Sequence, residues 1–188
     1  MINSVRITDL HTIEQHSSKD DHIEENLWIS AIDPEDRGAI KNIRQYFAGN
    51  NIPHHVEYFY DVDDTDLLED SNLHTEWIVN APNKEHVSRF IDFLWSYVKS
   101  KTPYNLGVNC FAGVSRSTAL GITAWVMQGN SPQEALQNIL DVRFCAWPNL
   151  RILRLSSEIL NMDIYNPVKK WVDENKTKIV MPSNSWKY

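Results

Sequence analysis

Residues 106–127 read LGVNCFAGVSRSTALGITAWVM and hold the most informative pattern in the chain. The first three residues predict a short buried strand, and 118–127 predicts a helix. The turn between them carries Cys110 six positions before Arg116, with Gly113 midway. A strand, a glycine-containing turn and a helix in direct succession are typical of α/β proteins.

The residue types in this turn suit anion binding beside a nucleophile. Backbone N–H groups in a turn before a helix converge on one point, where the helix N-terminus adds partial positive charge. Gly113 permits a tight backbone, and the Arg116 guanidinium can donate two hydrogen bonds to one phosphate. The same field favours the nucleophilic thiolate of Cys110, and Ser117 can donate a hydrogen bond to that sulfur when it departs. The alternative is an inert buried cysteine near a surface arginine.

The rest of the chain alternates predicted strands with predicted helices. Apolar, aromatic and β-branched runs predict strands at 4–10, 27–32 and 56–62. Capping residues and helical apolar spacing predict four further helices, at 39–49, from 83 to 98, from a Ser-Pro-Gln-Glu capping box at 131, and at 149–160, the last of the chain. We therefore expect an α/β fold with a central sheet of about four to five mostly parallel strands flanked by helices.

Length and composition limit the classes of protein. With 188 residues and 42% apolar residues, the chain predicts a single domain over 1–188, with a core at about 27–160 and a C-terminal extension at 167–188. Two cysteines cannot build a disulfide framework, and no apolar run is long enough for a membrane span or a signal peptide. A cytoplasmic location is expected. The net charge of -7 disfavours general binding of nucleic acids or anionic membranes.

The charge is divided unevenly along the chain. Residues 1–80 contain 17 acids and 5 bases, whereas 81–188 contain 8 acids and 13 bases. The stretch 57–76 carries eight acids and no base, which predicts a solvated acidic loop. One of its carboxylates can still serve in chemistry.

The segment from Cys110 to Ser117 resembles the phosphate-binding loop of the cysteine-dependent protein phosphatases, whose pattern is His-Cys-x5-Arg-Ser/Thr. Its Ala-Gly-x-Ser-Arg-Ser form is similar to the dual-specificity branch and its compact bacterial relatives. Softer matches follow in the same order: LWISAI with Asp33-Pro34, the YFYDV segment, the helix at 85–97, and Pro148-Asn149. The resemblance covers roughly residues 27–160.

The resemblance implies a role for each residue of the loop. Cys110 would be the nucleophile and form a phosphocysteine, and Ser117 would assist breakdown of that intermediate. Arg116 and the loop amides would hold the phosphoryl oxygens, with the amides supplied by Phe111, Ala112, Gly113, Val114, Ser115 and Arg116 itself. The family needs no metal and no cofactor for this chemistry.

The family also uses an aspartic acid on an upstream loop as general acid and then as general base. Asp61 is the first candidate, because Tyr60-Asp61-Val62 lies where the predicted strand gives way to the acidic loop. Asp63 and Asp64 are the alternatives. The separation of 49 positions from Asp61 to Cys110 is longer than in many dual-specificity members.

One position departs from the family pattern. Asn109 stands where the family usually has the histidine that orders the loop, and asparagine cannot become cationic. We expect an active enzyme with a less activated Cys110. The alternative that this departure favours is a non-catalytic module that only binds phosphorylated residues.

These features predict a phosphomonoester hydrolase whose partner is a phosphorylated protein or peptide, with phosphotyrosine first and dual specificity as an alternative. Phosphoinositides rank lower because residues 111–115 contain no lysine, and RNA 5′ ends rank lower because the chain is acidic. No HxH or HExxH pattern supports a metal hydrolase. Neither nucleic acid nor a membrane is expected as a partner.

Two features outside the loop admit a functional alternative. Cys145 is expected to be inert, and the alternative is a disulfide that protects an oxidised Cys110. A tail group of Lys169, Lys170, Trp171, Lys176 and Lys178 is expected to be packed or solvated rather than bound to an anionic partner.

Overall fold

A four-stranded parallel sheet forms the centre of the protein. The computed structural model describes residues 1–19, 22–64, 74–100 and 102–176. The strand order is β1-β4-β2-β3, and every pairing is parallel. The strand bounds are β1 (Ile2–Asp9), β2 (Leu27–Ile32), β3 (His54–Tyr58) and β4 (Tyr104–Cys110).

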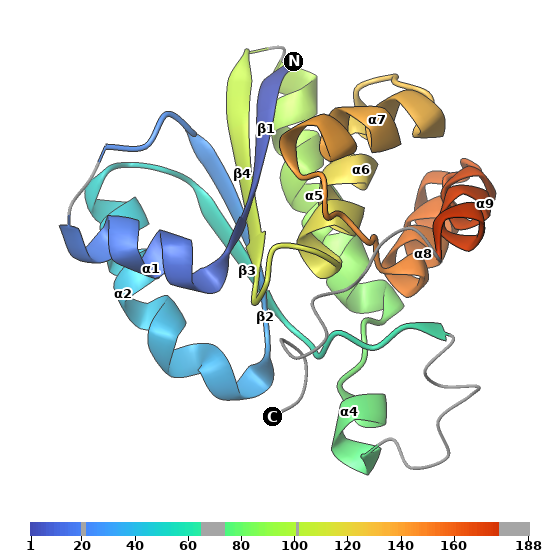
Figure 1. Cartoon of the computed structure of the whole chain (residues 1–188). Coiled ribbons are helices and arrows are strands. Elements are labelled where there is room, and N and C mark those ends of the chain that lie inside the picture. The colour runs from blue at the N-terminus through green and yellow to red at the C-terminus, as the bar shows by residue number, and fades with distance from the viewer. Residues whose placement is uncertain (20–21, 65–73, 101, 177–188) are drawn as a thin grey trace.

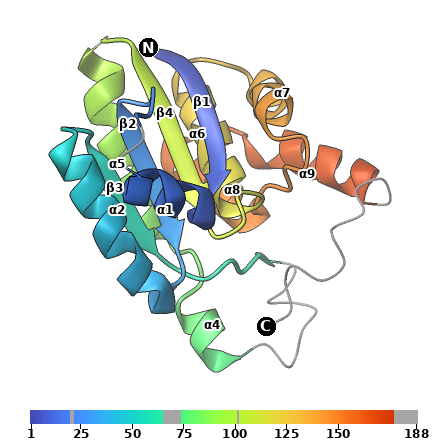
Figure 2. The ribbon, with the colours of Figure 1, turned by 60° about the vertical axis from the view of Figure 1, so that its left-hand side comes forward.

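Helices cover both faces of the sheet, as Figures 1 and 2 show. The described residues form eight α-helices and one 3-10 helix: α1 (Leu10–Lys19), η1 (Pro34–Asp36), α2 (Arg37–Gly49), α4 (Thr75–Val79), α5 (Lys84–Ser100), α6 (Arg116–Met127), α7 (Pro132–Val142), α8 (Leu150–Leu160) and α9 (Tyr165–Asn175). α1 and α2 lie on one face, whereas α5, α6 and α7 lie on the other, with α8 and α9 packed outside them. This architecture confirms the predicted α/β fold.

Alternation along β4 sends neighbouring side chains to opposite faces. Leu106, Val108 and Cys110 join the apolar core under α5, α6 and α7. Gly107 instead faces Trp28, which belongs to the second apolar core under α1 and α2. A Cβ atom on Gly107 would lie 2.1 Å from Cε3 of the Trp28 ring, so the indole takes the space that a side chain at 107 would need.

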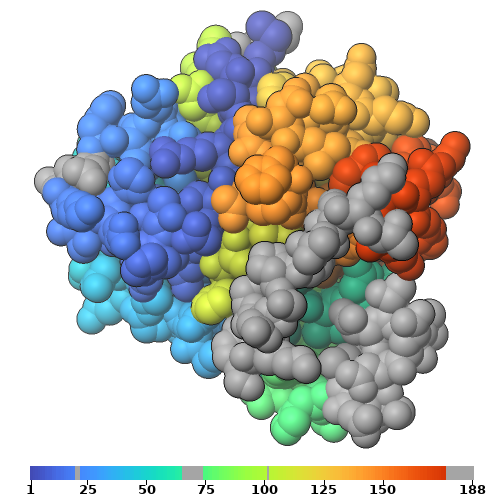
Figure 3. All heavy atoms as spheres, viewed as in Figure 1, coloured from blue at the N-terminus to red at the C-terminus, as the bar shows by residue number. Residues whose placement is uncertain are grey.

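The carboxyl ends of all four strands meet at one edge of the sheet, because the strands are parallel. Loops that follow β2, β3 and β4 therefore come together there, which is the usual place for a site in an open α/β sheet. α4 lies beyond this edge (Figure 1). In the space-filling view, yellow-green atoms of the segment after β4 reach the surface between the blue helices and the orange ones (Figure 3).

Most of the predicted elements are confirmed, including the N-cap of α8 and the capping box of α7. Asn149 accepts a hydrogen bond from the Ile152 N–H, and Ser131 and Glu134 form the reciprocal pair. Asn83 likewise accepts from the N–H of His86 at the start of α5.

Three expectations were wrong in detail. β3 ends at Tyr58 rather than 62. The N–H of Phe59 still donates to the Ile32 carbonyl of β2, but the Phe59 carbonyl accepts a hydrogen bond from Arg116 and not from a strand, so the pairing stops there. The acidic stretch 57–76 begins inside β3 and ends inside α4, while 65–73 lie outside the described residues. The helix at 149–160 is not the last, since α9 follows it.

α9 packs against the core through Val168 and Val172, both of which are buried. Its Lys169 and Asp173 form an ion pair on the exposed side. The division into a core and a C-terminal extension stays a prediction, and 177–188, with Lys178, lie outside the described residues. No helix in the described part of the chain is long and apolar enough to cross a membrane.

We expect Gly107→Ala to lower the free energy of unfolding by about 1–3 kcal/mol, because the added methyl group collides with the Trp28 ring. Urea unfolding followed by tryptophan fluorescence measures this loss. Gly38→Ala in α2 is the matched control, because its Cβ would meet no atom within 4 Å. A Gly107→Ala protein as stable as Gly38→Ala would contradict the packing described for Trp28.

Candidate active site

The turn after β4 directs its carbonyl groups outward. The carbonyls of 111–115 all accept hydrogen bonds from groups outside the turn: Phe111 from Leu10 N, Ala112 and Gly113 from Arg143, Val114 from Trp147 N, and Ser115 from Asn149 N. In a trans peptide the N–H points opposite to the C=O of the same unit. The N–H groups of 112–116 therefore point to the inside of the turn, as a nest for an anion requires.

Gly113 is required by both its backbone and its surroundings. Its φ is +68°, in the left-handed region that disfavours side chains. A Cβ there would lie 2.6 Å from the carbonyl carbon of Thr8, at the end of β1. β1 thus supports the turn by direct backbone approach as well as by pairing with β4.

Arg143 is a supporting residue that the sequence analysis missed. It follows α7, and its Nε donates to the Gly113 carbonyl at 2.9 Å while Nη2 donates to the Ala112 carbonyl at 2.8 Å. These two bonds fix the outward orientation of two successive carbonyls. No local sequence signal marks this role, because the arginine is 30 residues from its partners.

Arg116 is 1% exposed and is held by a buried carboxylate. Nη1 donates to Asp33 Oδ1 at 2.6 Å and to the Phe59 carbonyl at 2.7 Å, and Nη2 donates to Asp33 Oδ2 at 3.3 Å. Burial opposes the charge, but Asp61 and Asp33 outweigh it and raise the pKa of Arg116. The guanidinium is therefore a fixed cation.

The remaining edge of Arg116 suits an oxyanion. A guanidinium has five N–H donors, and the three bonds above leave Nε–H and one Nη2–H on the same side. Nε is buried and has no hydrogen-bond partner. An Nε/Nη2 pair is the fork that binds two oxygens of a phosphate.

Cys110 and Ser117 meet at the base of the turn. Cys110 is 1% exposed at the end of β4, and its Sγ lies 3.2 Å from Oγ of Ser117 in the first turn of α6. The structure thus brings together the cysteine, the arginine and the serine that the sequence pattern predicted. Cys145 is free and partly exposed.

The three candidate aspartates have different contacts. Asp61 contacts the turn: its Oδ1 accepts from Ser115 Oγ at 2.7 Å and from Asn149 Nδ2 at 2.9 Å, and Oδ2 lies 3.7 Å from Arg116 Nε. Asp63 and Asp64 are bonded to α8 instead. Oδ2 of Asp63 accepts from the Leu150 N–H, and Asp64 pairs with Arg151 and Arg154.

Asn109 is completely buried and faces away from Cys110, toward α1 and α2. Its Oδ1 accepts hydrogen bonds from Trp28 Nε1 at 2.8 Å and from Ser30 Oγ at 2.7 Å.

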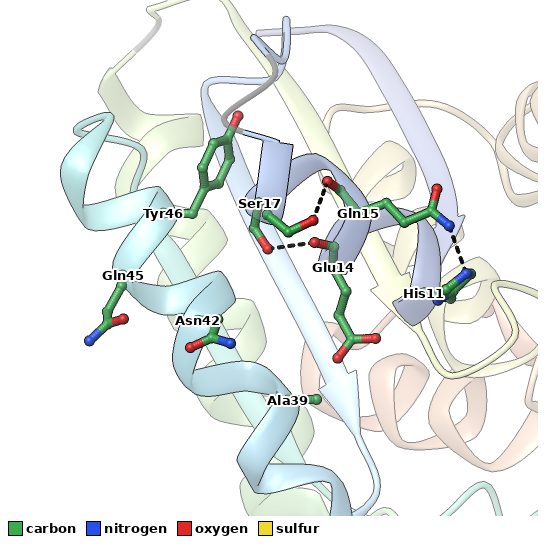
Figure 4. Close-up of a pocket in the computed structure, with 9 residues that line it drawn as sticks. His11, Glu14, Gln15, Ser17, Ala39, Asn42, Gln45 and Tyr46 are labelled. Atoms are coloured by element: carbon green, nitrogen blue, oxygen red, sulfur yellow. Dashed lines mark hydrogen bonds between the residues drawn. The ribbon is translucent and has the colours of Figure 1, made fainter.

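A groove of about 590 Å³ lies elsewhere, between α1 and α2 (Figure 4). Its lining includes His11, Glu14, Asn42 and Tyr46 but none of the predicted site residues. We therefore place the candidate site at the turn, on the chemistry of its residues. The described residues hold no group of three or more His, Cys, Asp or Glu side chains that could bind a metal ion.

No protein-family model and no curated protein sequence matches the chain. Its fold does match solved structures. PTPMT1 is 16% identical, with a TM-score of 0.50 over 92% of this chain and 96% of that chain. The PTP-2 phosphatase of Cydia pomonella is 14% identical (TM-score 0.52, 83% and 85%). The human tyrosine phosphatase-like serine/threonine/tyrosine-interacting protein is 17% identical (TM-score 0.51, 81% and 82%).

These matches cover most of the chain and define the class of fold. It is that of the cysteine-dependent dual-specificity phosphatases, as the loop resemblance predicted. At identities of 14–17% the likeness defines the fold alone.

We expect Gly113→Ala to lose binding of inorganic phosphate. A methyl group there would push the turn away from Thr8, and the N–H groups of the turn would no longer point to one place. Isothermal titration with phosphate measures this. Gly129→Ala is the matched control: its φ is also positive, at +96°, but its Cβ meets nothing within 4 Å. That control should lose about 1–2 kcal/mol of stability and keep its phosphate affinity.

Asp64 should contribute to stability in a pH-dependent way. Burial alone raises the pKa of Asp64, but hydrogen bonds from Arg154 and Arg151 outweigh it and hold the pKa below its usual value. A depressed carboxyl pKa stabilises the fold above the unfolded pKa of about 3.9, and this contribution is lost as the pH falls through the folded pKa.

Asp64→Asn should therefore lower the free energy of unfolding by about 1 kcal/mol at pH 7, and by progressively less below about pH 4. Urea unfolding from pH 7 to pH 3 tests this. Asp173→Asn, which removes an exposed helix ion pair, should change little at any pH. If Asp64→Asn lowered the free energy of unfolding by the same amount at every pH, the stabilisation could not come from the charge of Asp64.

Proposed function

We propose that the protein is a phosphomonoester hydrolase that works through a phosphocysteine intermediate. One observation carries this proposal: the Cys110 thiol lies at the base of a turn whose N–H groups point inward, beside an arginine whose Nε makes no hydrogen bond and faces Asp61 Oδ2 at 3.7 Å. An anion nest, a bidentate arginine and a thiol together suit transfer of a phosphoryl group to sulfur.

The proposed reaction has two steps. In the first, the Cys110 thiolate attacks phosphorus and the P–O bond to the leaving group breaks, while the protonated Asp61 gives that oxygen its proton. In the second, Asp61 takes a proton from water, the water oxygen attacks phosphorus, and the P–S bond breaks. Ser117 Oγ, 3.2 Å from Sγ, donates a hydrogen bond to the departing thiolate.

The contacts of the aspartates support Asp61 as the acid. It lies against Ser115 and Arg116, so its carboxyl group borders the place where the phosphoryl group would bind. Asp64 is neutralised by two arginines of α8 and would have to break both ion pairs to reach the turn. Asp63 caps the first N–H group of the same helix.

We propose a phosphorylated protein or peptide as the substrate, with phosphotyrosine first. The thiol is 1% exposed, so a long aryl phosphate reaches it more readily than a short alkyl phosphate. A structure of PTPMT1 in complex with PI(5)P has the same fold, which makes phosphoinositides the second substrate class to assay. The turn of this chain has no lysine at 111–115 to bind additional phosphates, so that class ranks lower.

Asn109 favours a second candidate function, a module that binds phosphorylated residues without hydrolysis. It replaces the histidine that such phosphatases usually carry before the nucleophile. A tyrosine phosphatase-like interacting protein shares the fold. The intact set of Cys110, Arg116 and Ser117 supports hydrolysis as the first candidate.

We expect the wild-type protein to hydrolyse p-nitrophenyl phosphate in EDTA, because a thiol and not a metal-bound water makes the attack. Cys110→Ser should lower kcat at least about a thousandfold and still bind phosphate. Cys145→Ser is the matched control and should keep full activity. Binding without turnover in the wild type would favour the second candidate, and turnover that EDTA abolishes but Cys110→Ser does not would contradict both.

Asp61→Asn should lower kcat about a hundredfold or more for phenyl phosphate, whose leaving group needs a proton, and less for p-nitrophenyl phosphate. Steady-state kinetics with both esters gives the comparison. Asp64→Asn should leave the ratio of the two rates as in the wild type. If Asp64→Asn rather than Asp61→Asn produced the dependence on leaving group, Asp64 would be the acid.

A further inference from the structure

A buried hydrogen-bond network joins three strands directly behind the candidate nucleophile. Ser30 on β2 lies opposite Asn109 on β4, and Trp28 lies opposite Gly107. Asn109 Oδ1 accepts from Trp28 Nε1 at 2.8 Å and from Ser30 Oγ at 2.7 Å. His54 on β3 extends the network, with its Nε2 2.8 Å from Ser30 Oγ.

The direction of each hydrogen bond in this network is determined. The indole N–H of Trp28 can only donate, so the atom of Asn109 that faces it must be the oxygen. Ser30 uses its single proton for that oxygen, and it therefore accepts from His54 Nε2–H. Burial, followed by Arg44 and His55, lowers the pKa of His54 to about 3, so this ring is neutral and carries one N–H.

The network depends on the glycine at 107. A side chain there would displace the Trp28 ring, whose Cε3 lies 2.1 Å from the Cβ position. Phe47 stacks on the other side of the indole, with ring centroids 5.1 Å apart. The Trp28 ring is thus held between Gly107 and Phe47 with its N–H on Asn109.

We propose that Trp28 and Ser30 are positioning residues for the candidate active site: they fix Asn109, and through it the backbone of Cys110 and the start of the turn at 111–115. Asn109 is completely buried and immediately precedes Cys110, so its two bonds restrain the peptide that carries the thiol. This role rests on the proposed function for its catalytic consequence.

An oxygen at this position does what an imidazole cannot. The Asn109 carbonyl oxygen has two lone pairs and accepts from both donors, whereas a neutral imidazole has one acceptor nitrogen. Trp28 and Ser30 therefore fit the oxygen of the asparagine, whereas its Nδ2 is buried without a hydrogen-bond partner. The position at which the family usually carries histidine is built here around an amide.

The test compares Trp28→Phe and Ser30→Ala with Ser156→Ala. Ser30 and Ser156 are both completely buried serines with side-chain hydrogen bonds, but Ser156 bonds to Thr123, between α6 and α8. We expect Trp28→Phe and Ser30→Ala each to weaken the binding of inorganic phosphate and to lower kcat for p-nitrophenyl phosphate by about tenfold. Ser156→Ala should lose comparable stability in urea and change neither value.

Asn109→His gives a second, independent reading. We expect Asn109→His to lower phosphate affinity and kcat. We expect the double variant Trp28→Phe/Asn109→His to recover part of both, because it lacks the indole N–H, for which the imidazole has no second acceptor. Recovery of this kind would not follow from a purely structural role. An Asn109→His protein that binds phosphate more tightly than the wild type would overturn the proposal.

The two readouts separate the proposals. Wild-type turnover together with wild-type kinetics in Trp28→Phe and Ser30→Ala would overturn the positioning role and leave hydrolysis intact. If the wild-type protein shows no turnover but Trp28→Phe and Ser30→Ala both bind phosphate more weakly than it does, the positioning role is supported and hydrolysis is overturned. Equal effects of Ser30→Ala and Ser156→Ala on phosphate binding would also overturn the positioning role.

Discussion

The buried ion pair between Arg116 and Asp33 joins the start of α6 to the end of β2. A guanidinium that is 1% exposed needs fixed acceptors, and Asp33 and the Phe59 carbonyl provide them from the ends of β2 and β3. Meeting this requirement stops β3 from continuing and turns the following chain across the edge of the sheet. Asp61 follows two residues after Phe59 and contacts Ser115 in the turn after β4, so one short segment supplies both an acceptor for the cation and its neighbouring carboxylate.

The uneven charge of the chain acquires a structural meaning at this point. The acidic first half supplies Asp33 and Asp61, and the basic second half supplies Arg116 and Arg143. An overall charge of -7 therefore does not prevent a local site for an anion, because fixed amides and one buried arginine determine the field there. The distant acids of the surface are screened by solvent.

The sequence predicted the elements whose signals are local. The strands at 27–32 and 106–108, the capping box and the loop pattern all depend on residues close to one another in the chain. α1 and α9 were missed because their polar compositions obscure the helical pattern. Arg143, Thr8 and Trp28 could not be assigned, since each contacts the turn after β4 or the end of β4 across 30 residues or more, and only the folded topology brings it there.

The contact between Gly107 and Trp28 has a consequence for how such a chain can vary. A side chain at 107 would displace the Trp28 indole, and Asn109 would then lose one of the two hydrogen bonds that its oxygen accepts. The residues at 28, 107 and 109 therefore depend on one another in this structure. Single replacements pass through an unfavourable intermediate, so relatives of this chain are expected to exchange the three residues together, with tryptophan and glycine accompanying asparagine.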